Sequence, residues 1–148
     1  MTIRKCSTRQ SVEILLVEDN PGDTRLMQEA FKEGGFNGRL NITCDGEQAI
    51  AFLRHEGPHA ESPRPAFILL DLNLPRKDGR EVLAEIKTDE KLRQIPVVVL
   101  STSTSAEDIR KAYDLHANCY IPKPVDLETF VELGRVIERF WLHTAVLG

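Results

Sequence analysis

The feature that most constrains this chain is the apolar run Phe67–Leu70, which leads directly into one acid, Asp71, and is then stopped by Pro75. Four consecutive apolar residues followed by a loop predict a β-strand that is buried on both faces, as in a parallel sheet. Asp71 then lies at the carboxyl end of that strand, the edge at which open α/β sheets bind ligands. A carboxylate next to a buried strand costs free energy, so its presence indicates a function. We interpret Asp71 as a nucleophile.

The alternation of strand and helix recurs along the whole chain. Short apolar or alternating runs predict strands at Ile14–Val17, Leu40–Thr43, Phe67–Leu70, Val97–Leu100 and Asn118–Ile121. Apolar residues at helical spacing predict helices over residues 23–34, 46–54, 79–88, 106–115 and 127–142. One glycine and three prolines in His55–Pro65 predict an extended surface loop without any regular element.

Five strands that alternate with five helices predict right-handed βαβ crossovers and a parallel sheet. The default architecture for this count is a flavodoxin-like three-layer α/β sandwich with a five-stranded sheet in the order 2-1-3-4-5. In that order the first and third strands are neighbours, so Asp19 and Asp71 are expected to meet at one edge. The 148 residues fit one domain, predicted over residues 11–148 after a loose tail over residues 1–10.

Charge and cysteine usage narrow the classes of partner. The net charge is -4 with acids and bases interspersed, which argues against binding to nucleic acid or to an anionic membrane surface. The three cysteines form no CxxC pair, which argues against a disulfide framework or a zinc site. No run resembles a signal peptide or reaches membrane-spanning length. We therefore expect a cytoplasmic location and a protein partner.

Polar side chains follow four of the five predicted strands. Glu18 and Asp19 follow the first strand, Asp71 the third, Ser101 the fourth and Lys123 the fifth. Three neighbouring carboxylates repel one another, so we expect a hard divalent cation, Mg²⁺ with Mn²⁺ or Ca²⁺ as substitutes. An ionised Asp71 can attack a phosphoryl group whose oxygens Lys123 and Ser101 hold. The predicted product is an aspartyl phosphate.

The segments around these residues resemble the receiver domain of two-component response regulators. The resemblance rests on LLVEDN from Leu15, LLDLNLPRKDG from Leu69, VVVLSTS from Val97 and YIPKP from Tyr120, and it covers about residues 14–140. It implies that Asp71 is the phosphoacceptor. The implied metal ligands are Glu18, Asp19, Asp71 and the backbone carbonyl of Asn73.

The resemblance also implies roles for residues beyond the acids. Ser101, Thr102 and Lys123 are expected around the phosphoryl group, and Tyr120 is expected to be a switch aromatic. The Lys123–Pro124 peptide bond is expected to be cis, as is usual in the family. Two positions depart from the family pattern, because Glu18 is longer than the usual aspartate and Thr102 is bulkier than the usual small residue. We expect slower loss of the phosphoryl group than from Thr102→Ala.

Within the family the chain is similar to cyanobacterial phytochrome-associated response regulators. The shared features are the proline-rich loop before the third strand, the phrase DGREVLAEIK from Asp78 and the FWL triplet from Phe140. This similarity implies a phytochrome histidine kinase as partner, a homodimer, and a receiver without a DNA-binding output domain. Phe140 and Trp141 are expected to contribute an apolar patch to the dimer surface on the last helix, with the fourth helix and fifth strand beside it.

Simpler interpretations and two other function classes remain open at this stage. If each residue is considered alone, the simple interpretation is an acid in a turn for Asp71, a helix cap for Glu18–Asp19 and a solvated lysine for Lys123. The occurrence of such residues at four strand ends favours a site instead. A phosphohydrolase is disfavoured because Asp71-Leu-Asn73 lacks the second acid. A flavodoxin-like electron carrier is disfavoured because two acids after the first strand repel a flavin phosphate. We expect a signalling phosphoacceptor, not an enzyme with turnover.

Overall fold

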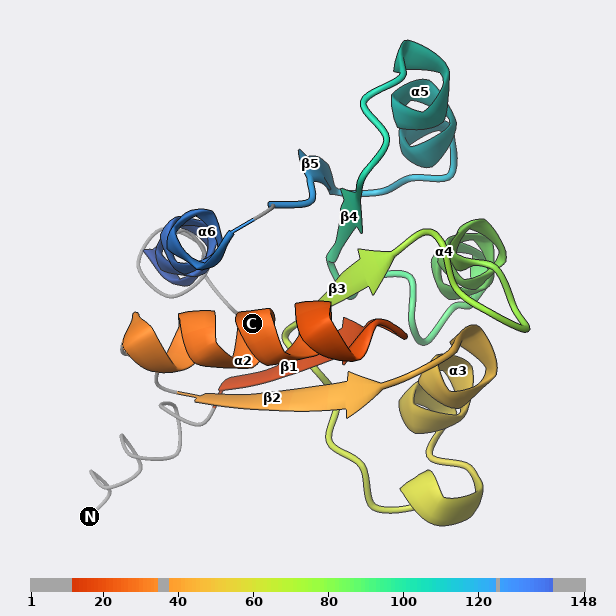
Figure 1. Cartoon of the computed structure of the whole chain (residues 1–148). Helices are drawn as coiled ribbons and strands as arrows, with labels where there is room; N and C mark the ends of the chain where they lie inside the picture. Colours follow the sequence, from red (N-terminus) through yellow and green to blue (C-terminus); the bar gives the residue numbers. More distant parts are fainter. Residues whose placement is uncertain (1–11, 35–37, 125, 140–148) are drawn as a thin grey trace. The chain divides into compact units, whose positions relative to one another are not determined.

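The computed structural model describes residues 12–34, 38–124 and 126–139, with the elements labelled in Figure 1. The strands in these residues are β1 (Val12–Val17), β2 (Gly38–Thr43), β3 (Phe67–Asp71), β4 (Val97–Ser101) and β5 (Cys119–Pro122). The α-helices are α2 (Pro21–Glu33), α3 (Gly46–Arg54), α4 (Gly79–Thr88), α5 (Ala106–Asp114) and α6 (Leu127–Arg139). Within these ranges no helix combines the length and apolar character that crossing a membrane requires. The predicted tail, Phe140 and Trp141 lie outside the described residues.

The five strands form one parallel sheet in the order β2-β1-β3-β4-β5, which confirms the predicted flavodoxin-like topology. In the register of the sheet, Val17 pairs with Leu70 and Asp71 pairs with Leu100. Every residue of β3 and of β4 is buried, as expected for strands covered on both faces. The carboxyl ends of the central strands therefore lie close together at one edge.

One compact unit comprises residues 13–19 and 40–123 and holds the site described below. Its α3 and α4 lie side by side, and both pack on the sheet (Figure 1). The core joins Leu15, Ile68 and Val99 of the strands with residues such as Ile50 of α3 and Leu83 of α4. This core fixes where the strand ends lie.

The other unit contains α2 and α6, which contact each other. Among their buried side chains are Met27 and Phe31 on α2 and Phe130 and Leu133 on α6. Gly134 permits the close approach, because an added Cβ there would lie 3.3 Å from the ring of Phe31.

Local sequence signals decide one of the alternative interpretations and explain one departure from the sequence expectations. Asn20 caps α2, accepting a hydrogen bond from the backbone N of Asp23 at 3.1 Å, so the cap is not formed by Glu18–Asp19. The segment expected to be wholly irregular contains a short 3₁₀ helix, η2 (Gly57–His59). Pro58 in its first turn has a fixed φ that suits a helix start, which explains the extra element.

Candidate functional site

The sheet brings the predicted site residues to one edge. Asp71 is the last residue of β3 and Ser101 the last residue of β4, while Glu18 follows β1 and Lys123 follows β5. Because these strands are parallel neighbours, their carboxyl ends meet at the same edge. The structure therefore brings together four groups that are spread over residues 18–123 of the sequence.

Three carboxylates form the acidic part of the site. Glu18, Asp19 and Asp71 each offer an oxygen, and these oxygens all lie within 4.8 Å of one another. Glu18 and Asp71 are buried, with 2% and 5% of their surface exposed, whereas Asp19 is exposed. A compact set of carboxylate oxygens with one exposed member fits a hard divalent cation that keeps some of its water.

The ammonium group of Lys123 bridges two of these acids. Its Nζ lies 2.8 Å from Glu18 Oε1 and 3.2 Å from Asp71 Oδ2, and its side chain is only 8% exposed. This contact offsets the repulsion and desolvation of two buried carboxylates. The backbone N–H of Lys123 donates to the carbonyl of Ser101 at 2.7 Å, which ties the lysine to the end of β4.

The Lys123–Pro124 peptide bond corrects one expectation. All peptide bonds between described residues are trans, including this one. The trans isomer is the more stable form of an X–Pro bond by about 0.5–1 kcal/mol, and Lys123 makes all the contacts given above with the bond trans. The predicted cis bond is therefore wrong for this structure.

The loop after β3 is held close to Asp71. Asp71 Oδ1 accepts a hydrogen bond from the backbone N of Asn73 at 3.1 Å, while the side chain of Asn73 is exposed. The loop closes where the Gly79 N–H donates to the Leu72 carbonyl at 3.0 Å. An added Cβ at Gly79 would lie 2.4 Å from the Cα of Leu72, so this closure requires glycine. A capping box formed by Asp78 then starts α4.

A chain of hydrogen bonds leads from Ser101 to Tyr120 through a residue that the sequence analysis missed. Ser101 Oγ accepts from the backbone N of Ser103 at 3.1 Å, and the Tyr120 hydroxyl donates to the Ser103 carbonyl at 2.8 Å. Ser103 Oγ donates to Asp108 at 2.6 Å, and this bond, followed by the Arg80 guanidinium, holds the pKa of Asp108 below its ordinary value. The Ser-x-Ser spacing, typical of a local side-chain turn, is the signal that predicts such a role.

Two further residues lie beside this series of hydrogen bonds. Tyr120 is half-buried, and its backbone N donates to the hydroxyl of Tyr113, a residue that is 46% exposed. Thr102, between the two serines, is exposed. The half-buried ring of Tyr120 thus connects the hydrogen-bonded interior of the site with the surface at α5.

Comparisons with known proteins agree with this geometry. The family model of the response regulator receiver domain matches residues 14–134. The response regulator Rcp1 of Synechocystis sp. is 52% identical over 134 residues, which cover 90% of this chain and 91% of Rcp1. The crystal structure of the phosphorylated cyanobacterial phytochrome response regulator RcpA is similar with a TM-score of 0.86, 53% identity and coverage of 93% of this chain and 98% of RcpA. The Mn²⁺-bound form of Rcp1 gives a TM-score of 0.84, 50% identity and coverage of 93% and 99%.

Proposed function

Since the chain belongs to the family of response regulator receiver domains, we propose that it accepts a phosphoryl group on Asp71 from a histidine kinase and then alters a protein-binding surface. The observation that supports this proposal is the position of Asp71 within an acidic cluster and in contact with the ammonium of Lys123, at the carboxyl edge of the sheet. The protein is then a cytoplasmic signalling phosphoacceptor of a two-component system, and its only chemistry is its own phosphorylation and slow dephosphorylation.

We assign a Mg²⁺ ion to the three carboxylates of Glu18, Asp19 and Asp71, together with the backbone carbonyl of Asn73. The assignment is supported by the compact oxygen donor set and by the Mn²⁺-bound structure of the related Rcp1. When bound, the cation supplies positive charge that stabilises the transferring phosphoryl group. The exposed position of Asp19 gives the ion a route to solvent.

The residues of the chain then divide the remaining work. A carboxylate oxygen of Asp71 forms a bond to phosphorus while the P–N bond of the phosphohistidine breaks, and a proton completes the released imidazole. Lys123 already donates to Asp71 Oδ2 and can turn to an oxygen of the acquired phosphoryl group. The buried hydroxyl of Ser101 can donate to another phosphoryl oxygen.

This last contact provides a route to the surface. Ser101 Oγ holds the backbone N of Ser103, and the Ser103 carbonyl holds the hydroxyl of Tyr120. A Ser101 hydroxyl that turns toward a phosphoryl group therefore shifts the acceptor of Tyr120, and we propose that the ring turns inward in response. Thr102, bulky and exposed beside Ser101, is proposed to slow loss of the phosphoryl group relative to Thr102→Ala.

For the partners, we propose a phytochrome histidine kinase and a second copy of this chain. The kinase proposal is supported by the 53% identity to RcpA, a phytochrome response regulator. The homodimer proposal is supported by exposed apolar side chains on α6, where Leu127 is 37% and Val136 47% exposed.

The test is phosphorylation by a small donor. The wild type, Asp71→Asn and Asp89→Asn are incubated with acetyl phosphate and Mg²⁺, and their intact masses are measured. Asp89 is a matched control because it is also an aspartate that accepts backbone N–H bonds in a turn, but it lies before β4. We expect one added phosphoryl group on the wild type and Asp89→Asn and none on Asp71→Asn. Equal labelling of all three would refute Asp71 as the acceptor.

A further inference from the structure

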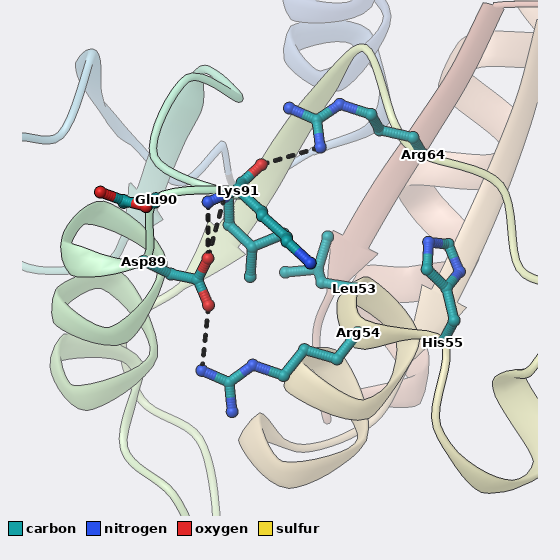
Figure 2. A pocket seen from close by; sticks show the side chains of 8 residues that line it. Leu53, Arg54, His55, Arg64, Asp89, Glu90 and Lys91 are labelled. Carbon is teal, nitrogen blue, oxygen red and sulfur yellow. Dashed lines mark hydrogen bonds and ion pairs between the residues drawn. The ribbon is translucent and has the colours of Figure 1, made fainter.

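A second candidate site lies on the same unit at the amino-terminal ends of β3 and β4. A cavity of about 670 Å³ opens between the end of α3, the segment before β3 and the turn that follows α4. Figure 2 shows its lining, which consists of Leu53, Arg54, His55, Arg64, Asp89, Glu90, Lys91 and Leu92. This volume lies in the range of pockets that bind small molecules. None of the proposed phosphorylation residues lines it.

Of the two acids that line this cavity, Asp89 is already hydrogen-bonded and ion-paired, and Glu90 points away from Arg64. Asp89 Oδ1 accepts from the backbone N–H groups of Lys91 and Leu92 at 2.7 and 3.3 Å, and Asp89 Oδ2 lies 3.3 Å from Arg54 Nη2. Arg54 also pairs with Glu85 at 2.9 Å, so its charge is balanced. The carboxylate of Glu90 points away from Arg64 in Figure 2. Neither Asp89 nor Glu90 therefore neutralises Arg64 or Lys91.

Two cations of the lining keep their charge available. Arg64 Nη1 donates to the backbone carbonyl of Lys91 at 2.9 Å, and Arg64 makes no ion pair with any described residue. This bond leaves further N–H donors of the guanidinium open. The Lys91 side chain reaches toward Leu53 in Figure 2, and across the described ranges its ammonium meets no carboxylate. His55 adds a ring at the rim, anchored by Nδ1 to Ser62 Oγ at 3.1 Å.

We propose that this cavity binds a small molecule that carries a compact oxyanion, either a phosphate or a carboxylate. The guanidinium of Arg64 offers the paired donors that suit such a group, and Lys91 adds a mobile point charge. Leu53 and Leu92 give the lining an apolar portion for the body of the ligand. The site is spatially separate from the phosphorylation site, because its lining residues lie at the edge of the sheet opposite Asp71.

Titration of the full chain, followed by two-dimensional amide NMR, tests the proposal. The probes are inorganic phosphate and butyrate, each added at constant ionic strength set with chloride in the absence of divalent cations. We expect saturable shifts at the amides of residues 53–55, 64 and 89–92. A lower dissociation constant for phosphate assigns a phosphate ester as the ligand class, and a lower dissociation constant for butyrate assigns a carboxylate with an apolar tail. Both results support the site.

Substitution of one exposed lysine and of one exposed arginine gives a matched comparison. Lys91→Gln and Arg93→Gln remove one positive charge each from the same turn, but only Lys91 lines the cavity. We expect Lys91→Gln and Arg64→Gln each to raise the dissociation constant about threefold, as for exposed charge pairs, and Arg93→Gln to leave it nearly unchanged. Shifts that do not saturate, or equal weakening by Lys91→Gln and Arg93→Gln, would overturn the proposal. Unperturbed amide signals in the rest of each spectrum verify the fold.

Discussion

The charged groups at the two edges of the sheet differ in burial: they are mostly buried and paired at the carboxyl edge and mostly exposed at the amino edge. At the carboxyl edge, Glu18 and Asp71 are buried and share the nearly buried ammonium of Lys123. At the amino edge, Arg64 and Lys91 are exposed beside an open cavity, where water screens them. Because desolvation makes a buried charge depend on its partner, removal of one group has a large effect at the first edge and a small effect at the second. Burial, more than the number of charges, sets the energy of each site.

The largest expected effect is that of Lys123→Met. It leaves two buried carboxylates without the ammonium that contacts both, and we expect unfolding free energy to fall by about 3–5 kcal/mol. Urea unfolding measures the change. Millimolar Mg²⁺ is expected to restore part of the loss, because the proposed cation neutralises the same acids.

Lys91→Met at the opposite edge is the matched control, since it removes the same charge from an exposed position. We expect a change within about 0.5 kcal/mol and no response to Mg²⁺. Similar losses for the two lysines would mean that burial does not distinguish the edges.

The second effect concerns the exposed member of the acidic cluster. Asp19→Asn removes a carboxylate ligand without creating a buried charge imbalance, so we expect little loss of stability but about tenfold weaker binding of Mg²⁺. Isothermal titration calorimetry with Mg²⁺ measures the affinity. Glu90→Gln, an exposed acid of the other edge, is expected to leave it unchanged. An undiminished affinity of Asp19→Asn would exclude Asp19 from the metal site.

A smaller effect is expected from Tyr120→Phe, which removes the donor to the Ser103 carbonyl and keeps the ring. The loss of one half-buried hydrogen bond predicts a destabilisation of about 1 kcal/mol in urea unfolding. It also predicts weaker coupling of phosphorylation to partner binding, measured as the ratio of partner affinities with and without the phosphoryl group. An unchanged ratio would argue against Tyr120 as the switch.

The smallest effect belongs to Asp89 at the amino edge. Hydrogen bonds from the backbone N of Lys91, the guanidinium of Arg54 and the backbone N of Leu92 hold the pKa of Asp89 below its ordinary value of 3.8. Because the folded pKa is the lower one, the stabilisation is present above pH 3.8 and is lost as the pH falls through the folded pKa. Thermal unfolding should therefore show a small gap between wild type and Asp89→Asn near neutrality that closes in acid. A gap that is constant over the whole range would contradict the assignment.

The sequence predicted what depends on periodicity and topology. The apolar runs specify the strands, and the parallel order of the strands then places Glu18, Asp71 and Lys123 at one edge. The sequence did not predict how side chains on the surfaces of neighbouring helices pair. One such feature is the Lys77–Glu85–Arg54 network, in which Arg54 of α3 meets Glu85 of α4 over a separation that no local pattern encodes.

The composition of a short polar segment also does not specify which hydrogen bonds it makes. The Ser101–Ser105 segment has the composition of a loop with a helix cap, and Ser105 does cap α5. The same composition hides the link that Ser103 makes between Ser101 and Tyr120, because the link depends on a backbone carbonyl and its direction. Chemistry at strand ends is therefore easier to predict than the connections that carry it outward.

Reductive trapping tests the central claim most directly. The protein is phosphorylated with acetyl phosphate and Mg²⁺, treated with borohydride, which reduces an acyl phosphate to an alcohol, and then mapped by peptide mass spectrometry. We predict that aspartate is converted to homoserine at position 71 alone. Conversion of Asp19 or Glu18, or of no residue in a sample whose intact mass shows phosphorylation, would contradict the assignment of Asp71 as the phosphoacceptor.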